Sequence, residues 1–322
     1  MLARKCRRTR HCQRPVNAVT FATFYFINMA TMASAAITIT YGLVAASLIA
    51  LWFPAIAINR RVSTPPWALL FAAACTSGML TGLVAPQAVA VLLAFAGLCH
   101  AARRCKAGVL KIFLMIAVGA MTLLLSLHRF PGFVNPPLVV DMQLSALSPA
   151  FTHRLNFDTS AAGLILFAYF CIPARSTKEW AAVARQYPAI LGTAITVLAL
   201  GAAAGFVGVD LKFSGYTLVF FACNLLFTCI TEEAFFRGFV QEKLALAMQR
   251  WRAGPYLALL IASILFGVAH MRGGPALIVL ASIAGFGYGY AYLRSKRIEA
   301  AILAHITLNT LHFIAFTYPR AL

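Results

Sequence analysis

The side chains best suited to chemistry in this chain are two adjacent carboxylates, Glu232 and Glu233. The residues just before them, 218–230, are apolar enough to form a helix buried in a lipid bilayer. An ionised carboxylate costs several kcal/mol in that environment, and such residues are usually functional. The whole chain has only 8 acidic residues, so two side by side in such a segment predict a functional site.

The spacing of the neighbouring charges assigns the two carboxylates different roles. Glu233 and Arg237 are four residues apart, so they share one helix face and can form an ion pair. Pairing compensates both charges in an apolar interior. Glu232 is rotated by about 100° around the same helix and has no cation at a pairing distance. It is therefore the candidate general base or acid.

Three further polar residues lie in the later apolar segments. His305 and Asn309 are also four apart on one face, and together they can offer two donors to one oxygen, as an oxyanion hole does. His270 follows Phe266 near the end of another segment. Taken singly, each has a structural explanation, such as a hydrogen-bonded buried histidine. Two Glu and two His are also compatible with a zinc site, although no His-Glu-x-x-His motif is present.

Composition predicts the elements that must position these residues. Of the 322 residues, 61% are hydrophobic and 11% charged, whereas soluble domains have about 45–50% and 25%. We expect an all-α fold, a polytopic integral membrane helix bundle of about 8–10 transmembrane helices. Candidate spans are residues 37–58, 67–84, 87–102, 112–127, 159–174, 187–208, 215–236, 255–271, 276–293 and 299–317, with 17–36 as a weaker one.

The net charge of +19 comes from short Lys and Arg clusters between apolar runs. That distribution is typical of cytoplasmic loops and excludes a basic face for nucleic acid. The lipid bilayer is the expected partner, with some clusters touching anionic lipid. The basic connections alternate with poorer ones at Pro86, 128–158, 210–215 and 272–275, which predicts a regular serpentine.

Four regions follow from this pattern. Residues 1–16 form a basic arm, for which a cytoplasmic arm, a signal-peptide n-region and a chain start at Met29 or Met32 are all compatible. Residues 17–127 are transmembrane helices of unassigned role. Residues 128–158 form a non-membrane loop whose prolines and aromatics favour an ordered cap over a plain connection. Residues 159–322 carry the chemistry-bearing segments.

Three segments together resemble the motifs of the CPBP family, which includes the type II CAAX prenyl endopeptidases and bacterial relatives, some of them linked to bacteriocin processing or immunity. In one-letter code they are EEAFFRG at 232–238, FGVAH at 266–270 and HITLN at 305–309. The resemblance covers roughly residues 187–317. It implies a glutamic-type intramembrane endopeptidase that needs no cofactor or metal.

Carried over by residue, the resemblance assigns Glu232 as the base that activates water. His270 would help to hold that water, and His305 and Asn309 would stabilise the oxyanion. Supporting roles fall to Glu233, Arg237 and Phe266. The substrate would be a membrane-associated protein or peptide.

Two alternatives remain open on the sequence. One is a non-catalytic immunity or binding membrane protein that keeps the polar cluster as a packed network. The other is a proton-coupled transporter that uses Glu232 and His270 as a relay, although no transporter-like internal repeat is present. We expect an integral membrane protein of the bacterial cytoplasmic membrane. One geometric difficulty concerns the depth of the two histidines in the membrane. If the spans simply alternate in direction, His305 lies near the side with the basic connections and His270 near the opposite side, so a shared site requires tilted or broken helices.

Overall fold

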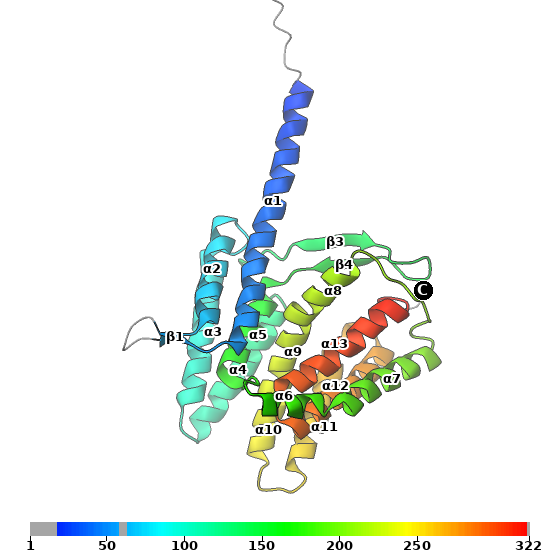
Figure 1. Ribbon diagram of the computed structural model, residues 1–322. Helices are drawn as coiled ribbons and strands as arrows, with labels where there is room; N and C mark the ends of the chain where they lie inside the picture. The colour runs from blue at the N-terminus through cyan, green and yellow to red at the C-terminus, as the bar shows by residue number, and fades with distance from the viewer. Residues whose placement is uncertain (1–17, 58–62, 321–322) are drawn as a thin grey trace, which may run out of the picture.

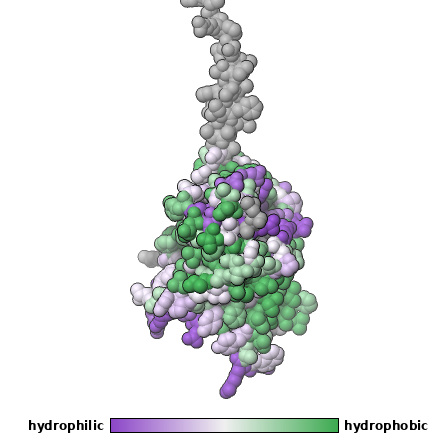
Figure 2. Space-filling view, turned by 90° about the vertical axis from the view of Figure 1, so that its right-hand side faces the viewer, coloured by the Kyte–Doolittle hydropathy of each residue, from purple (hydrophilic) through white to green (hydrophobic). Residues whose placement is uncertain are grey.

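The structure is a computed structural model that describes residues 18–57 and 63–320, with only the backbone described for 18–33. It is a helical bundle (Figure 1), which confirms the predicted all-α polytopic membrane fold. Seven helices are long and apolar enough to cross a membrane, and three shorter apolar helices accompany them in the described part of the chain. Figure 2 shows the matching surface, with a broad hydrophobic band between hydrophilic ends.

The first half of the chain forms α1 to α4, two short hairpins and α5. The bounds are α1 Ala18–Ile49, β1 Ile56–Ala57, β2 Ser63–Thr64, α2 Pro66–Leu80, α3 Pro86–Arg104, α4 Val109–Ser126, β3 Pro137–Met142, β4 Phe151–Arg154 and α5 Phe157–Phe170. A single helix covers both 17–36 and most of 37–58, so the weaker predicted span is not separate. The predicted basic arm at 1–16 lies outside the described residues.

The second half carries the remaining helices. Their bounds are α6 Thr177–Ala184, α7 Tyr187–Ala203, α8 Thr217–Cys223, α9 Ile230–Glu233, α10 Glu242–Ala247, α11 Gly254–Ala269, α12 Pro275–Ser295 and α13 Ile298–Ala315. Proline in the first turn starts α7, α11 and α12, where its missing N–H costs nothing. A capping box at Ser176 and Glu179 starts α6.

Two apolar cores flank the α8–α10 run. The first joins α1, α2, α3 and α5, and it reaches that run through Ile230, Ala234 and Phe239. The second joins α7, α11, α12 and α13, and it reaches the run through Phe236. The elements that carry the predicted site residues therefore lie at the boundary of the two cores.

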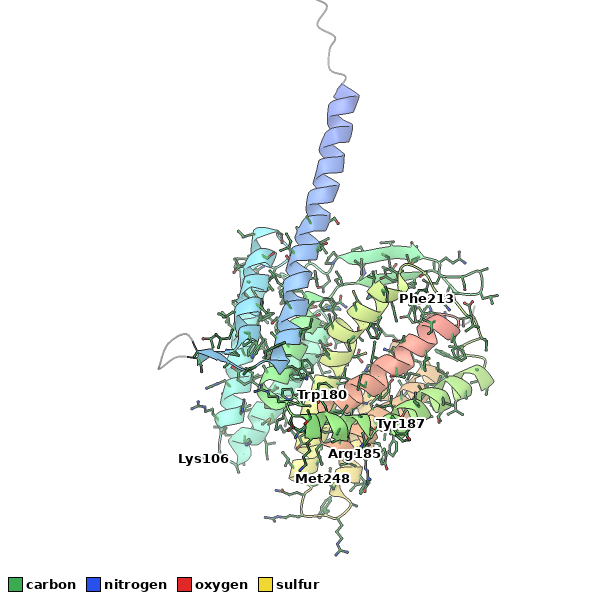
Figure 3. The ribbon with its side chains drawn as sticks, viewed as in Figure 1. Lys106, Trp180, Arg185, Tyr187, Phe213 and Met248 are labelled. Carbon is green, nitrogen blue, oxygen red and sulfur yellow. The ribbon has the colours of Figure 1, made fainter. Side chains whose placement is uncertain are left out.

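Successive helices run in opposite directions, so the connections gather at two ends. One, the basic end, holds the connections around 103–111, 171–186, 242–254 and 294–298. The other, the hairpin end, holds the β3–β4 hairpin and the connections around 204–216, 270–274 and 316–320. In Figure 3, Lys106 and Arg185 lie at the first end and Phe213 at the second. This arrangement confirms the predicted alternation.

The predicted loop at 128–158 contains the β3–β4 hairpin at its centre. Ser145 and Ser148 from the hairpin both donate to Asp210 in the α7–α8 connection, and Lys212 pairs with the same carboxylate at 3.1 Å. The Ser145 hydrogen bond, helped by Lys212, holds the pKa of Asp210 below its ordinary value of 3.8. The hairpin is thus fastened across the end of the bundle.

Candidate active site

Two π-helical stretches bracket the carboxylate pair. Residues Asn224–Cys229 and Ala234–Gln241 are π-helical, and the four-residue α9 that carries Glu232 and Glu233 lies between them. π-Helical turns are rare and occur often at functional sites. The small residue Gly163 of α5 lets this segment pack closely, since a Cβ there would lie 2.5 Å from the Cα of Thr231. The backbone at the pair is therefore unusual in winding and tightly held.

Glu233 is fully buried at the centre of an ion-pair network. Its Oε1 accepts hydrogen bonds from Arg237 Nη1 and from His305 Nδ1, both at 2.8 Å. Arg237 is also fully buried and donates through Nη2 to the carbonyl of Gly285 on α12 at 2.9 Å. The guanidinium carbon lies 4.6 Å from the centre of the Phe266 ring. The pairing predicted from the four-residue spacing is therefore present, and Phe266 packs on it.

His305 connects this network to a cavity. An ionised carboxylate only accepts, so the bond to Glu233 assigns a proton to Nδ1 of His305 and leaves Nε2 for another partner. The ring stacks on Tyr288, with centroids 4.7 Å apart and an interplanar angle of 19°. The contacts with Glu233 and Tyr288 thus fix the orientation of the His305 ring, and the hydrogen bond to Glu233 fixes which nitrogen faces away from the ion pair.

His270 has a comparable local arrangement. It ends α11, and its Nδ1 lies 2.8 Å from the carbonyl oxygen of Phe266, which can only accept. Nδ1 therefore carries a proton, and in the neutral ring Nε2 is an acceptor. The ring also lies against Phe266, with centroids 4.7 Å apart. A neutral histidine held in this way can accept a hydrogen bond from a water molecule.

Glu232 differs from the other buried carboxylates in what surrounds it. Its Oε2 is buried and has no hydrogen-bond partner among the described residues. The same holds for one oxygen of Glu233 and one of Glu299, yet neither of those residues lines the cavity. Glu299 instead accepts from Trp52 Nε1 at 2.7 Å and from the amide of Ala174 at 2.6 Å. Of these three carboxylates, Glu232 is thus the one that lines the cavity.

One cavity of about 410 Å³ brings the predicted catalytic residues together: Glu232, His270, His305 and Asn309 all line it. The expected difference in depth between His270 and His305 is absorbed by tilt, because Figure 1 shows α13 and α7 crossing the bundle obliquely. The shared site thus occurs without a change in the predicted alternation.

Asn309 has a partner that the sequence analysis missed. Its Nδ2 donates to Oδ1 of Asn224 at 2.9 Å, and Asn224 also lines the cavity. The thiol of Cys229 donates to the same oxygen at 3.3 Å. Asn224 is a buried amide eight residues before Glu232. Its position as a polar residue within an apolar run could have indicated from the sequence that it belongs to the site. Asn224, Asn309 and Cys229 therefore form one hydrogen-bonded group beside the cavity.

The mouth of the cavity is formed by the hairpin end. Phe151 to Arg154 of β4 line it, together with Phe206 and Tyr318. His153 is held by Tyr216, whose hydroxyl lies 2.7 Å from Nδ1, and burial lowers the pKa of this histidine. His153 is therefore neutral near pH 7. The mouth therefore combines aromatic side chains with polar ones.

The donor set of this site suits a metal poorly. Oε1 of Glu233 and Nδ1 of His305 are bonded to each other, and Arg237 pairs with the same oxygen. In the described part of the chain, no three His, Cys, Asp or Glu side chains are arranged to hold an ion. The cavity instead offers hydrogen-bond donors, the acceptor nitrogen of the His270 ring and the unpartnered carboxylate of Glu232.

Comparison with known families matches this region. Residues 214–311 match the family described as "Type II CAAX prenyl endopeptidase Rce1-like". The chain carries an Rce1-like domain. No curated protein and no solved structure matched the chain. The Rce1-like domain spans α8 to most of α13 and contains all four predicted catalytic residues. The chain is therefore an integral membrane protein with an Rce1-like domain, while the hairpin and α7 lie outside the matched segment.

Proposed function

We propose that this protein is a glutamic-type intramembrane endopeptidase that hydrolyses a peptide bond in a membrane-associated protein or peptide. One observation carries the proposal: the buried, unpartnered Oε2 of Glu232 belongs to a residue lining a cavity that His270, His305 and Asn309 also line. The Rce1-like domain supports the same reaction class. The protease core would extend over residues 159–322, with 128–158 as its cap.

The attacking water is held between Glu232 and His270. It donates one hydrogen bond to the free carboxylate oxygen and one to Nε2 of His270, which is an acceptor because Nδ1 carries the proton. Glu232 takes a proton from the water as the water oxygen bonds to the carbonyl carbon of the substrate. The same carboxyl group then gives that proton to the leaving amine nitrogen as the C–N bond breaks, so Glu232 ends in its starting state.

The oxyanion is stabilised from the opposite side of the cavity. Nε2 of His305 can donate only if the ring is an imidazolium, since Nδ1 is already a donor to Glu233. In that state the charges of Glu232, Glu233, Arg237 and His305 sum to zero, which suits an apolar interior. Asn309 adds an amide donor. Preorganised donors of this kind supply most of the transition-state stabilisation in many hydrolases.

The test is a replacement of Glu232 by glutamine. Membranes of cells that express the wild-type protein, Glu232→Gln or Glu242→Gln are compared by mass spectrometry of newly formed protein N-termini. Glu242 lies ten residues later, where its Oε2 accepts from Tyr292, and glutamine can keep that bond. We expect Glu232→Gln to lose the new termini, since a general base contributes about 10²–10⁴-fold, and Glu242→Gln to keep them.

The result that refutes the proposal is equally direct. If Glu232→Gln folds and yields the same new N-termini at the same rate, hydrolysis does not depend on this carboxylate. A different outcome is that no new protein N-terminus depends on the wild-type protein, while Glu232→Gln still changes the behaviour of the cells. In that case the polar cluster has a binding or transport role. Thermal unfolding of each variant serves as the folding control.

A further inference from the structure

The cavity of the proposed protease is lined by connections from one end of the bundle, the hairpin end. Its mouth is made of residues 151–156 of the hairpin, 206–207 of the α7–α8 connection and Tyr318. Lining residues such as Gly201 on α7 and Leu277 on α12 lie in the halves of their helices nearer that end, whereas Tyr288 and His305 lie just past the middle of theirs. None of the described residues in the connections of the basic end contributes to the lining. A peptide therefore reaches Glu232 from the hairpin end.

The described connections of the two ends differ strongly in charge. At the basic end the described Lys and Arg residues number four within 103–111, three within 175–185, three within 243–252 and three within 294–297. At the hairpin end there are two within 129–154 and one each at 212, 272 and 320. Acidic residues are three at each end, so the difference is in the cations. Connections rich in Lys and Arg remain in the cytoplasm.

The surface supports a membrane between these ends. On the face that Figure 2 shows, hydrophobic residues dominate the middle and hydrophilic ones gather toward the two ends, as a bilayer requires. Exposed apolar side chains on α4 and α11, such as Phe113 and Ile264, belong to the described residues of this hydrophobic middle. The cavity mouth and the basic connections are therefore on opposite sides of the bilayer.

We infer that the site faces away from the cytoplasm and takes a segment of an exported, membrane-anchored protein that approaches from the outer side. The inference about substrate rests on the proposed protease function, whereas the inference about orientation does not. The aromatic side chains at the mouth, Phe151, Phe206 and Tyr318, suit an apolar segment leaving the membrane, and the scissile bond lies deeper, beside Glu232.

Cysteine labelling in the full-length protein tests the orientation. Leu147→Cys is placed at the exposed tip of the hairpin, and Arg250→Cys in the exposed α10–α11 connection. Intact bacteria are treated with a membrane-impermeant maleimide before and after permeabilisation, and the parent protein gives the background from native cysteines. We expect Leu147→Cys to label fully in intact cells and Arg250→Cys only after permeabilisation. The reverse pattern overturns the inference.

A third variant tests access to the cavity itself. Thr228 lines the cavity one helical turn before Glu232. Thr228→Cys is treated with a small negatively charged thiosulfonate in right-side-out and in inside-out vesicles. Reaction in right-side-out vesicles alone supports an outward-facing site, and reaction in inside-out vesicles alone overturns it. Both labelling tests need no cleavage, so a failure of the protease proposal, measured with Glu232→Gln, remains distinguishable.

Discussion

Replacing Arg237 by methionine tests the network that holds the site. The change keeps an unbranched, apolar stem but removes the guanidinium that donates to Glu233 and to the carbonyl of Gly285. Glu233 then stays fully buried with one remaining donor, His305. Removing one partner of a buried ion pair costs about 3–5 kcal/mol, because the other charge is left uncompensated. An exposed pair contributes only about 0–1 kcal/mol.

The free energy converts to a measurable shift in melting temperature. With an unfolding entropy of about 2.1 cal/mol/K per residue, a chain of 322 residues loses roughly 4–8 °C. The buried thiols of Cys75, Cys99 and Cys229 provide a native reporter, since a thiol-reactive dye becomes fluorescent only when they are exposed. The measurement uses the purified protein in detergent at a fixed heating rate. Arg250→Met, at an exposed cation, is the matched control.

A second substitution separates charge from packing. In Arg237→Met combined with Glu233→Gln, the uncompensated carboxylate is gone, so part of the lost stability should return. The reasoning is refuted if Arg237→Met melts where Arg250→Met does, or if the double variant is less stable than Arg237→Met. Either result would mean that the buried pair is not what holds α9 against α12 and α13.

Other contacts support three more predictions. Gly163→Ala should cost about 1–3 kcal/mol and slow cleavage, because the added Cβ meets the backbone of Thr231; unchanged melting and rate would contradict it. Asn224→Ala should lower the cleavage rate about 10²–10³-fold with little change in substrate affinity, whereas a purely structural role would change melting alone. The hydrogen bond from Ser145 depresses the pKa of Asp210 in the folded protein. The stability that ionised Asp210 gives to the fold should therefore be present above pH 3.8, the ordinary pKa, and be lost as the pH falls below it. Asp210→Asn should abolish that part of the dependence of the melting temperature on acid pH.

Much of the architecture follows from the sequence because membrane solvation is a strong local constraint. A bilayer demands long apolar segments, and the cations between them mark alternate connections, so helix positions and the serpentine were predictable. The pairing of Glu233 with Arg237 was predictable for a related reason. Residues four apart on a helix are neighbours wherever that helix lies in space.

The site itself depends on contacts between distant segments, which no local pattern encodes. His305 bonds to Glu233 across 72 residues, and Asn309 to Asn224 across 85. The two π-helical stretches change which side chains face the cavity, and the oblique course of α13 brings its histidine to the depth of His270. Such details arise from packing between the two cores.

The order of the residues alone establishes a polytopic membrane protein with two costly carboxylates, one paired within its own helix and one left over. Both conclusions rest on solvation and on helical spacing, which act locally. The folded bundle was needed to show that Glu232 shares a cavity with His270, His305 and Asn309, and that the cavity opens at the hairpin end. Those facts depend on how helices far apart in the chain tilt and pack, because burial and convergence are properties of the assembled bundle.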